Sequence, residues 1–418
     1  MNGIDSIETM LSAVVDGGKL AGAATLIFRG DSTRVACVGV RDLKSRLPVE
    51  RDTIFRIASM TKPVTSTLAL MLFEEGRFRL EDPITRFAPE FENMRVLRSP
   101  EGPIEDSCAA ERPIIFKDLL THCAGFSNSA LHRGPIGKAY ADALGRDIDN
   151  ELAPDEWIAG LAQLPLIDQP GNGFHYGNST DLLGFLVARI EDTPLEEVLQ
   201  RRVFAPLGMK DTGFLVPVEK RSRRAGLCGF NDDGHLTALK TVPGGHTLPE
   251  RPDGMTWVSG GQGLWSTLDD YLSFARMFVG EGIVDGVRLL KPQTLSMMAS
   301  NQLTTTQRTS AKMFGRSLFE VGHGYGFGVA VVTEPEKADP LRCGGGVGAV
   351  GWPGAYGGWW QADRNDGSVM IFLAHNMVEL HQMAAGIGLS VWDAISEFQA
   401  LGTAAVRVRL GSHGKPSA

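Results

Sequence analysis

Three residues of this sequence have the types and the spacing needed to attack an ester or amide carbonyl. Ser59 and Lys62 lie three positions apart in the segment RIASMTKP (56–63). A serine hydroxyl is a poor nucleophile until a base removes its proton, and a partly desolvated lysine one helical turn away can do this or polarise another base. Tyr176, the only tyrosine followed by x-Asn, is a second candidate base, because a phenol beside a lysine cation loses its proton more readily.

Each of these patterns also has a simpler explanation. Ser-x-x-Lys arises by chance in a chain of this size, and the segment SHGK (412–415) matches it as well. That second copy lies in a tail containing glycine and proline, with no helix after it, so we discount it. A single tyrosine is most often a half-buried residue that bonds to the backbone, and Tyr176 needs support from its surroundings.

The elements around these residues must place them in a cleft. An apolar stripe at helical spacing follows Lys62, Gly76 is a natural end for that helix, and Pro63 is tolerated only in a first turn. Ser59 is therefore predicted at the helix N-terminus, where its backbone N–H and the helix dipole favour an anion. Tyr176 is predicted on the loop before a second amphipathic helix. The stripe residues are Val64, Leu68, Met71 and Leu72, and those of the second helix are Leu182, Leu183, Leu186 and Ile190.

Strand patterns lie at both ends of the chain and helical patterns between them. We predict a helix over 4–15, strands over 23–28, 33–40, 325–332, 355–361 and 368–375, a last helix over about 379–398 and a frayed tail over 411–418. This order predicts one sheet built from both termini. It divides the chain into a discontinuous α/β lobe (1–56 and 300–418) and a mainly helical lobe (57–299).

Composition excludes several classes of function. The 418 residues carry a net charge of −8, which argues against nucleic acid as a partner, since phosphate binding needs a basic face. The five cysteines form no C-x-x-C pair and no two histidines have His-x-x-x-His spacing, so we predict no metal and no cofactor. The N-terminus has no signal-peptide pattern and no run of about 18 apolar residues occurs, so we expect a cytoplasmic protein without a membrane partner.

Glycine is over-represented, with 50 of 418 residues or about 12%, against a usual share near 7%. Many of these glycines fall between residues 344 and 358, where the string 346–351 satisfies the dinucleotide-binding pattern. No room remains after it for a βαβ unit, so we reject a nucleotide role. The cluster instead indicates a backbone that approaches another group closely.

Three ordered motifs carry a family resemblance. SMTK (59–62), YGN (176–178) and WPG (352–354) resemble the three boxes of the serine β-lactamase and penicillin-binding superfamily. More narrowly, the chain resembles the class C β-lactamase-like esterases, also called family VIII carboxylesterases. Three further stretches agree with those enzymes: LLTHCAG (119–125), PLGMKDT (206–212) and SGGQGLWSTLDD (259–270).

The resemblance implies an α/β (α+β) fold of the β-lactamase type, an antiparallel sheet flanked by helices plus a helical lobe, with the active site between them. By this likeness Ser59 is the acylated nucleophile, and Lys62 and Tyr176 share the general-base work; which of the two holds the proton at rest stays open. The backbone N–H groups of Ser59 and Ala355 would form the oxyanion hole.

The substrate side of the site departs from the penicillin-type pattern. Asn178 would donate to a substrate carbonyl, and Trp352 and Gly354 would contact the substrate. Where penicillin-type enzymes usually have Lys-Thr-Gly, Trp352 offers an apolar wall and no charge for a carboxylate. Pro353 predicts an exposed strand edge, because proline cannot donate to a ladder.

These residues predict a serine carboxylesterase that hydrolyses small neutral esters through an acyl-enzyme. Retention of Asn178 leaves weak β-lactam hydrolysis open. The alternatives are an amidase or D-amino-acid peptidase of the same superfamily, an acyltransferase that hands the acyl group to an alcohol, and a silent binding protein that keeps the fold. The intact Ser59, Lys62 and Tyr176 argue against the last.

Overall fold

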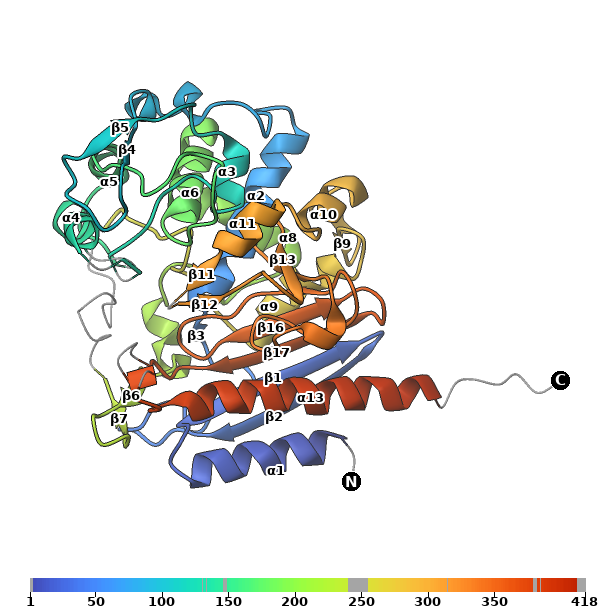
Figure 1. Cartoon of the computed structure of the whole chain (residues 1–418). Helices are drawn as coiled ribbons and strands as arrows, with labels where there is room; N and C mark the ends of the chain where they lie inside the picture. The colour runs from blue at the N-terminus through green and yellow to red at the C-terminus, as the bar shows by residue number, and fades with distance from the viewer. Residues whose placement is uncertain are drawn as a thin grey trace.

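A seven-stranded antiparallel sheet joins the two ends of the chain (Figure 1). The structure is a computed structural model that describes residues 3–129, 131–132, 134–145, 149–239, 255–313, 315–378, 382–383 and 385–411. The strand order is β13-β14-β15-β16-β17-β1-β2, and every neighbouring pair is antiparallel. The strands are β1 (Gly22–Arg29), β2 (Ser32–Gly39), β13 (His323–Tyr325), β14 (Ala330–Val332), β15 (Val350–Gly351), β16 (Trp359–Asp363) and β17 (Ser368–Ala374).

The paired strands β1 and β17 carry apolar side chains on both faces of the sheet. In the β1–β17 pair, Leu26 lies opposite Ile371 and both belong to the larger core, whereas Ile27 lies opposite Met370 and both belong to the smaller core. Successive side chains of a strand point to opposite faces, so each face of the sheet must be covered by another layer.

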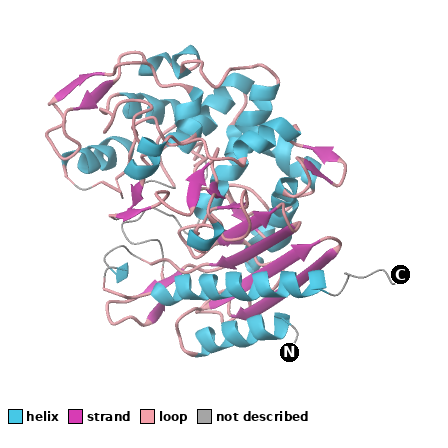
Figure 2. Ribbon diagram, turned by 45° about the vertical axis from the view of Figure 1, so that its right-hand side comes forward, coloured by secondary structure: helices cyan, strands magenta, loops and turns pink. Residues whose placement is uncertain are grey.

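Helices from both chain ends cover one face. In Figures 1 and 2, α1 (Gly3–Asp16) and α13 (Leu389–Gly411) lie side by side along the sheet, at the bottom of the view. Their apolar side chains Leu11 and Phe398 are fully buried, and the Phe398 ring lies 5.7 Å from that of Phe372 on β17. The other face packs against α9 (Leu268–Ala275), on the side of the helical half of the molecule.

The helical half is organised around two neighbouring helices, α2 (Thr61–Glu74) and α6 (Ser179–Glu191). Gly184 of α6 permits close packing, since a Cβ there would lie 2.7 Å from Leu195 and 3.6 Å from Thr65 of α2. The other helices are α3 (Phe116–Leu120), α4 (Pro135–Leu144), α5 (Pro154–Ala162), α7 (Leu195–Leu199), α8 (Ala205–Leu207), α10 (Pro292–Met298) and α11 (Thr305–Ser310). Short strand pairs lie outside the seven-stranded sheet: β3 (Phe55–Arg56) with β8 (Trp265–Ser266), β4 (Arg95–Leu97) with β5 (Ser107–Ala109), β6 (Cys228–Phe230) with β7 (Leu236–Ala238), β9 (Ile283–Val284) with β10 (Val287–Arg288), and β11 (Lys312–Met313) with β12 (Arg316–Ser317).

The predicted α+β fold with an antiparallel sheet is confirmed, as are the first helix, the first two strands and the strand over 368–374. The single strand predicted over 325–332 is wrong. Residues 326–329 turn the chain between β13 and β14, and Gly328 there has φ +84°, a conformation that favours glycine. The strand predicted from residue 355 begins only at Trp359, because Gly357 takes φ +81° in the turn before it.

The last helix also differs from the prediction. It begins at Leu389, after Gly386 and Gly388 with φ +80° and +75°, and extends to Gly411. Residues 379–381 of the predicted helix and 412–418 of the predicted tail lie outside the described residues. Pro353 does not mark a sheet edge: β15 ends at Gly351 and lies between β14 and β16.

Candidate active site

Ser59 lies where a short strand turns into α2. β3 pairs with β8, and after Ile57 the residues Ala58–Met60 form a 3-10 turn that runs directly into the helix. Ala58 has φ +46°, a left-handed conformation that costs a non-glycine residue about 1–3 kcal/mol and persists only where its surroundings impose it. The predicted position of Ser59 at the helix N-terminus is therefore what the structure shows, and its side chain is 8% exposed.

Two side chains from different elements converge on the Ser59 hydroxyl. Tyr176 Oη donates a hydrogen bond to Ser59 Oγ at 2.8 Å, and Lys62 Nζ donates to the same oxygen at 3.2 Å. The Lys62 ammonium also lies 4.5 Å from the centre of the Tyr176 ring. Both groups can therefore exchange a proton with the hydroxyl, which is the arrangement that an activated serine requires.

A third partner of Lys62 was missed by the sequence reasoning. Lys62 Nζ donates to the carbonyl oxygen of Gly261 at 2.8 Å. Asp181 of α6, 4% exposed, fixes this loop, because its Oδ1 accepts from Ser259 Oγ at 2.5 Å and from Gly261 N at 3.0 Å. The sequence did contain a sign of this contact: Asp181 adjoins the apolar stripe of the helix that follows Tyr176. A carboxylate buried there needs hydrogen-bond donors.

Trp352 contacts the phenol directly. Its indole Nε1 donates to Tyr176 Oη at 3.1 Å, and the side chain is 3% exposed. The rings of Tyr176, Tyr325 and Phe319 lie 5.6, 5.4 and 6.2 Å from the indole and enclose it. The sequence predicted an apolar wall at this position and gave no sign of the hydrogen bond.

The backbone of the third motif packs against the residues that precede the nucleophile. A Cβ on Gly354 would lie 2.5 Å from the carbonyl oxygen of Ile57, and one on Gly358 would lie 2.8 Å from Met60 Sδ. Gly354 N donates to Gly358 O at 2.7 Å, which closes a tight turn around the exposed Ala355. The structure thus brings the two predicted oxyanion-hole segments together, while the role of their N–H groups stays a prediction.

Asn178 directly precedes α6 and is 7% exposed. The loop that carries it and Tyr176 is held in place, because a Cβ on Gly177 would lie 2.7 Å from the carbonyl carbon and oxygen of Ser127. Asn178 is thus fixed two residues from Tyr176. Its contact with a substrate carbonyl stays a prediction.

Two histidines lie near Tyr176 but form no hydrogen bond with Ser59, Lys62 or the Tyr176 hydroxyl. His122 is fully buried, its ring lies 4.8 Å from that of Tyr176, and burial together with Lys62 holds the pKa of the imidazole well below its ordinary value. His175 pairs with Asp168 at 2.9 Å. His122 is therefore neutral at physiological pH and adds no charge beside Tyr176.

Other kinds of site find no support in the residues described. These residues contain no group of three or more His, Cys, Asp or Glu side chains that could hold a metal ion. All five cysteines are free, and burial raises the pKa of the Cys123 thiol to about 12, so it is no nucleophile at neutral pH. The helices over the described ranges are too short or too polar to cross a membrane.

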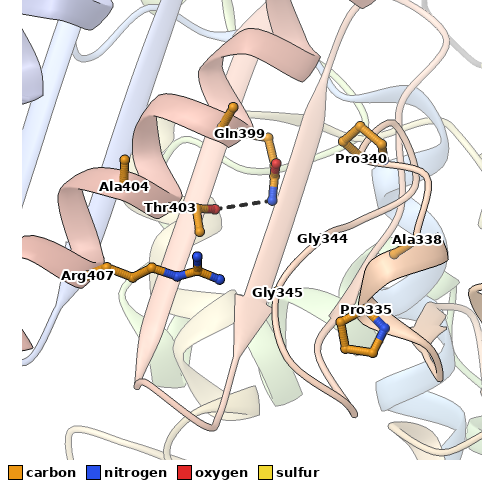
Figure 3. A pocket seen from close by; sticks show the side chains of 10 residues that line it. Pro335, Ala338, Pro340, Gly344, Gly345, Gln399, Thr403, Ala404 and Arg407 are labelled. Carbon is orange, nitrogen blue, oxygen red and sulfur yellow. Dashed lines mark hydrogen bonds between the residues drawn. The ribbon is translucent and has the colours of Figure 1, made fainter.

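A separate pocket of about 670 Å³ lies between α13 and the loop that leads to β15. In Figure 3, Gln399, Thr403 and Arg407 of the helix face Pro335 and Pro340 of the loop. None of the predicted site residues lines this pocket, so it is distinct from the Ser59 centre.

Comparisons with known proteins agree with the serine-centred site described above. A family model described as Beta-lactamase matches residues 7–389. The chain is 40% identical over 383 residues to Protein Rv1367c of Mycobacterium tuberculosis (91% of this chain and 92% of that protein), and 28% identical over 416 residues to Esterase EstB of Burkholderia gladioli (93% and 95%). A solved variant of simvastatin synthase from Aspergillus terreus has a TM-score of 0.77 at 22% identity, covering 97% of this chain and 98% of that one, which shows a shared fold.

Proposed function

The chain belongs to the beta-lactamase family and is an enzyme of the serine hydrolase type, and we propose that it hydrolyses small neutral esters through an acyl-enzyme on Ser59. The convergence of Tyr176 Oη and Lys62 Nζ on Ser59 Oγ carries this proposal. A buried hydroxyl with two proton-exchanging partners, at the start of a helix, has what nucleophilic catalysis needs. The name of EstB, a relative over nearly the whole chain, also supports esterase activity.

In the proposed reaction, Ser59 Oγ attacks the ester carbonyl while its proton passes to the Lys62–Tyr176 pair. The carbonyl oxygen becomes an oxyanion, for which the N–H groups of Ser59 and Ala355 are the proposed donors. The close approach of Gly354 to Ile57 supports this pairing, because it brings the two backbone segments together. The pair then returns the proton to the leaving alcohol, and water cleaves the acyl-enzyme by the same route.

The proposed preference for neutral substrates rests on Trp352. A penicillin-type substrate carries a carboxylate that a cation normally holds, and a charged hydrogen bond of this kind contributes about 1.5–3 kcal/mol. The indole has no charge, and its single N–H is already donated to Tyr176. We therefore propose fast turnover of neutral short-chain esters and only weak β-lactam hydrolysis.

The nucleophile is tested by covalent labelling. Active protein is incubated with p-nitrophenyl butyrate, and separately with a fluorophosphonate, and the adduct is located by mass spectrometry. We expect the label on Ser59, no turnover by Ser59→Ala, and unchanged turnover and labelling by Ser412→Ala, the matched control that removes the other Ser-x-x-Lys. Active protein that carries no label on Ser59 would refute the mechanism.

The substrate class is tested by competition between substrates. We expect p-nitrophenyl butyrate to have a much higher kcat/KM than benzylpenicillin or a p-nitroanilide, and equal values would overturn the preference for neutral esters. Added alcohol distinguishes hydrolysis from acyl transfer. A rate of acyl transfer to the alcohol that exceeds hydrolysis would make the protein an acyltransferase that uses the same Ser59 chemistry.

A further inference from the structure

Among the residues that the structure describes, the Tyr176 oxygen has two hydrogen-bond partners, and the direction of one bond is fixed. An indole N–H can only donate, so Trp352 Nε1 donates to Tyr176 Oη at 3.1 Å whatever the protonation state of the phenol. The other partner is Ser59 Oγ, to which the neutral phenol donates at 2.8 Å. When Tyr176 is a phenolate and Ser59 keeps its proton, the Tyr176 oxygen accepts hydrogen bonds from both Ser59 Oγ and Trp352 Nε1.

Few ionisable groups on the elements that pack against Tyr176 can affect the charge of its phenol. Lys62 Nζ of α2 lies 4.5 Å from the ring centre. His122 is neutral, and burial raises the pKa of Tyr325 on β13 well above its ordinary value, so that phenol is neutral too. Asp168 and His175, on the loop before Tyr176, pair with each other. The indole N–H is thus the one neutral donor among these residues that acts directly on the reacting oxygen.

We propose that Trp352 is a positioning residue for catalysis, whose indole N–H holds Tyr176 against Ser59 and stabilises its phenolate. The inference rests on the proposed function. In the step it assists, the Ser59 O–H bond breaks as the Tyr176 O–H bond forms. The electron pair left on Ser59 Oγ then makes the bond to the carbonyl carbon. A hydrogen bond to the charged form of an acid favours that form, so the N–H stabilises the phenolate that accepts the Ser59 proton.

The surroundings of the indole allow the N–H to be removed with little change in shape. Tyr325 and Phe319 enclose the ring, and the side chain is 3% exposed. Trp352→Phe keeps an aromatic ring in this enclosure and removes the donor. Benzothienylalanine at position 352 replaces the N–H with sulfur at almost the same shape, and it serves if the phenylalanine variant does not fold.

The test is the dependence of kcat/KM on pH with p-nitrophenyl butyrate. We expect the acidic limb of the profile to move up by about one pH unit in Trp352→Phe, because one charged hydrogen bond is lost. At pH values below the limb, kcat/KM then falls about tenfold, and the loss shrinks at higher pH, above the limb of both proteins. Tyr325→Phe is the matched control: its hydroxyl is buried without a hydrogen-bond partner among the described residues, and its removal should leave the limb in place.

Two results would overturn the inference. One is an unchanged acidic limb in a folded Trp352 variant, which would assign the resting base to Lys62 alone or leave the indole as packing. The other is an equal effect of Trp352→Phe in wild-type and Tyr176→Phe backgrounds, since a residue that acts through Tyr176 loses its effect when the phenol is gone. Fluorophosphonate labelling of Ser59 separates both from failure of the proposed function, because they leave the label on Ser59.

Discussion

Replacement of Gly354 by alanine should damage catalysis more than it damages the fold. The backbone at Gly354 lies outside the left-handed region, so alanine is conformationally acceptable there and the neighbouring carbonyl of Ile57 is the obstacle. The new Cβ would lie 2.5 Å from that oxygen, whereas ordinary contact begins at 3.4 Å. The two segments must therefore separate by about 0.9 Å, the difference between these distances.

This displacement falls on the proposed oxyanion hole. Ala355 follows Gly354, and Ile57 lies two residues before Ser59, so the two N–H groups move apart. A misplacement near 1 Å can cost about 10²-fold in rate, and loss of one oxyanion donor costs about 10²–10³-fold. We expect kcat to fall by about two orders of magnitude. Overpacking of this size destabilises a protein by about 1–3 kcal/mol, which leaves a domain of ordinary stability folded.

The assay combines initial rates on p-nitrophenyl butyrate with thermal melting followed by circular dichroism. Gly213→Ala is the matched control, since its backbone is also outside the left-handed region and the nearest atom to its new Cβ, the Leu215 oxygen, lies at 3.7 Å. We expect it to keep wild-type kcat. A folded Gly354→Ala protein with wild-type kcat would refute the placement of the oxyanion hole, as would a control that loses as much activity.

Three further predictions concern buried ionisable residues. Asp181→Ala should lower kcat about 10–100-fold with little change in KM, because Asp181 no longer holds the Gly261 carbonyl against Lys62. Asp181→Asn can still accept these hydrogen bonds and should recover part of the loss. Arg56→Met should lower the free energy of unfolding in urea by about 3–5 kcal/mol, because it removes the guanidinium that bonds both oxygens of the buried Asp149, and a loss below 1 kcal/mol would contradict this. Burial lowers the pKa of His375 from its ordinary 6.5 to about 4, so the unfolded chain binds the proton at a higher pH than the folded protein does. The free energy of unfolding should therefore fall by about 3 kcal/mol as the pH drops from 6.5 to 4. His375→Gln should flatten this dependence.

Sequence patterns predicted the helices and strands that are determined mainly by residues close together in the chain. The stripe after Lys62 predicted the helix that begins at Thr61, just after Ser59, and a run of apolar residues predicted the strand over 368–374. The strand prediction failed between residues 325 and 332. There the turn depends on Gly328, whose left-handed backbone lies so close to α2 that a Cβ would come within 2.4 Å of Ser66 Oγ.

The sequence by itself determined the chemistry of the nucleophile, because Ser59 and Lys62 are one turn apart and helix geometry brings such residues to the same side. Tertiary structure decided what surrounds them. Tyr176 is 117 positions from Ser59, the Gly261 carbonyl is 199 positions from Lys62, and the Trp352 indole is 176 positions from Tyr176. No local periodicity links such groups; their hydrogen bonds exist because α2, α6 and the sheet pack at fixed distances, and this packing turned a predicted apolar wall at Trp352 into a hydrogen-bond donor.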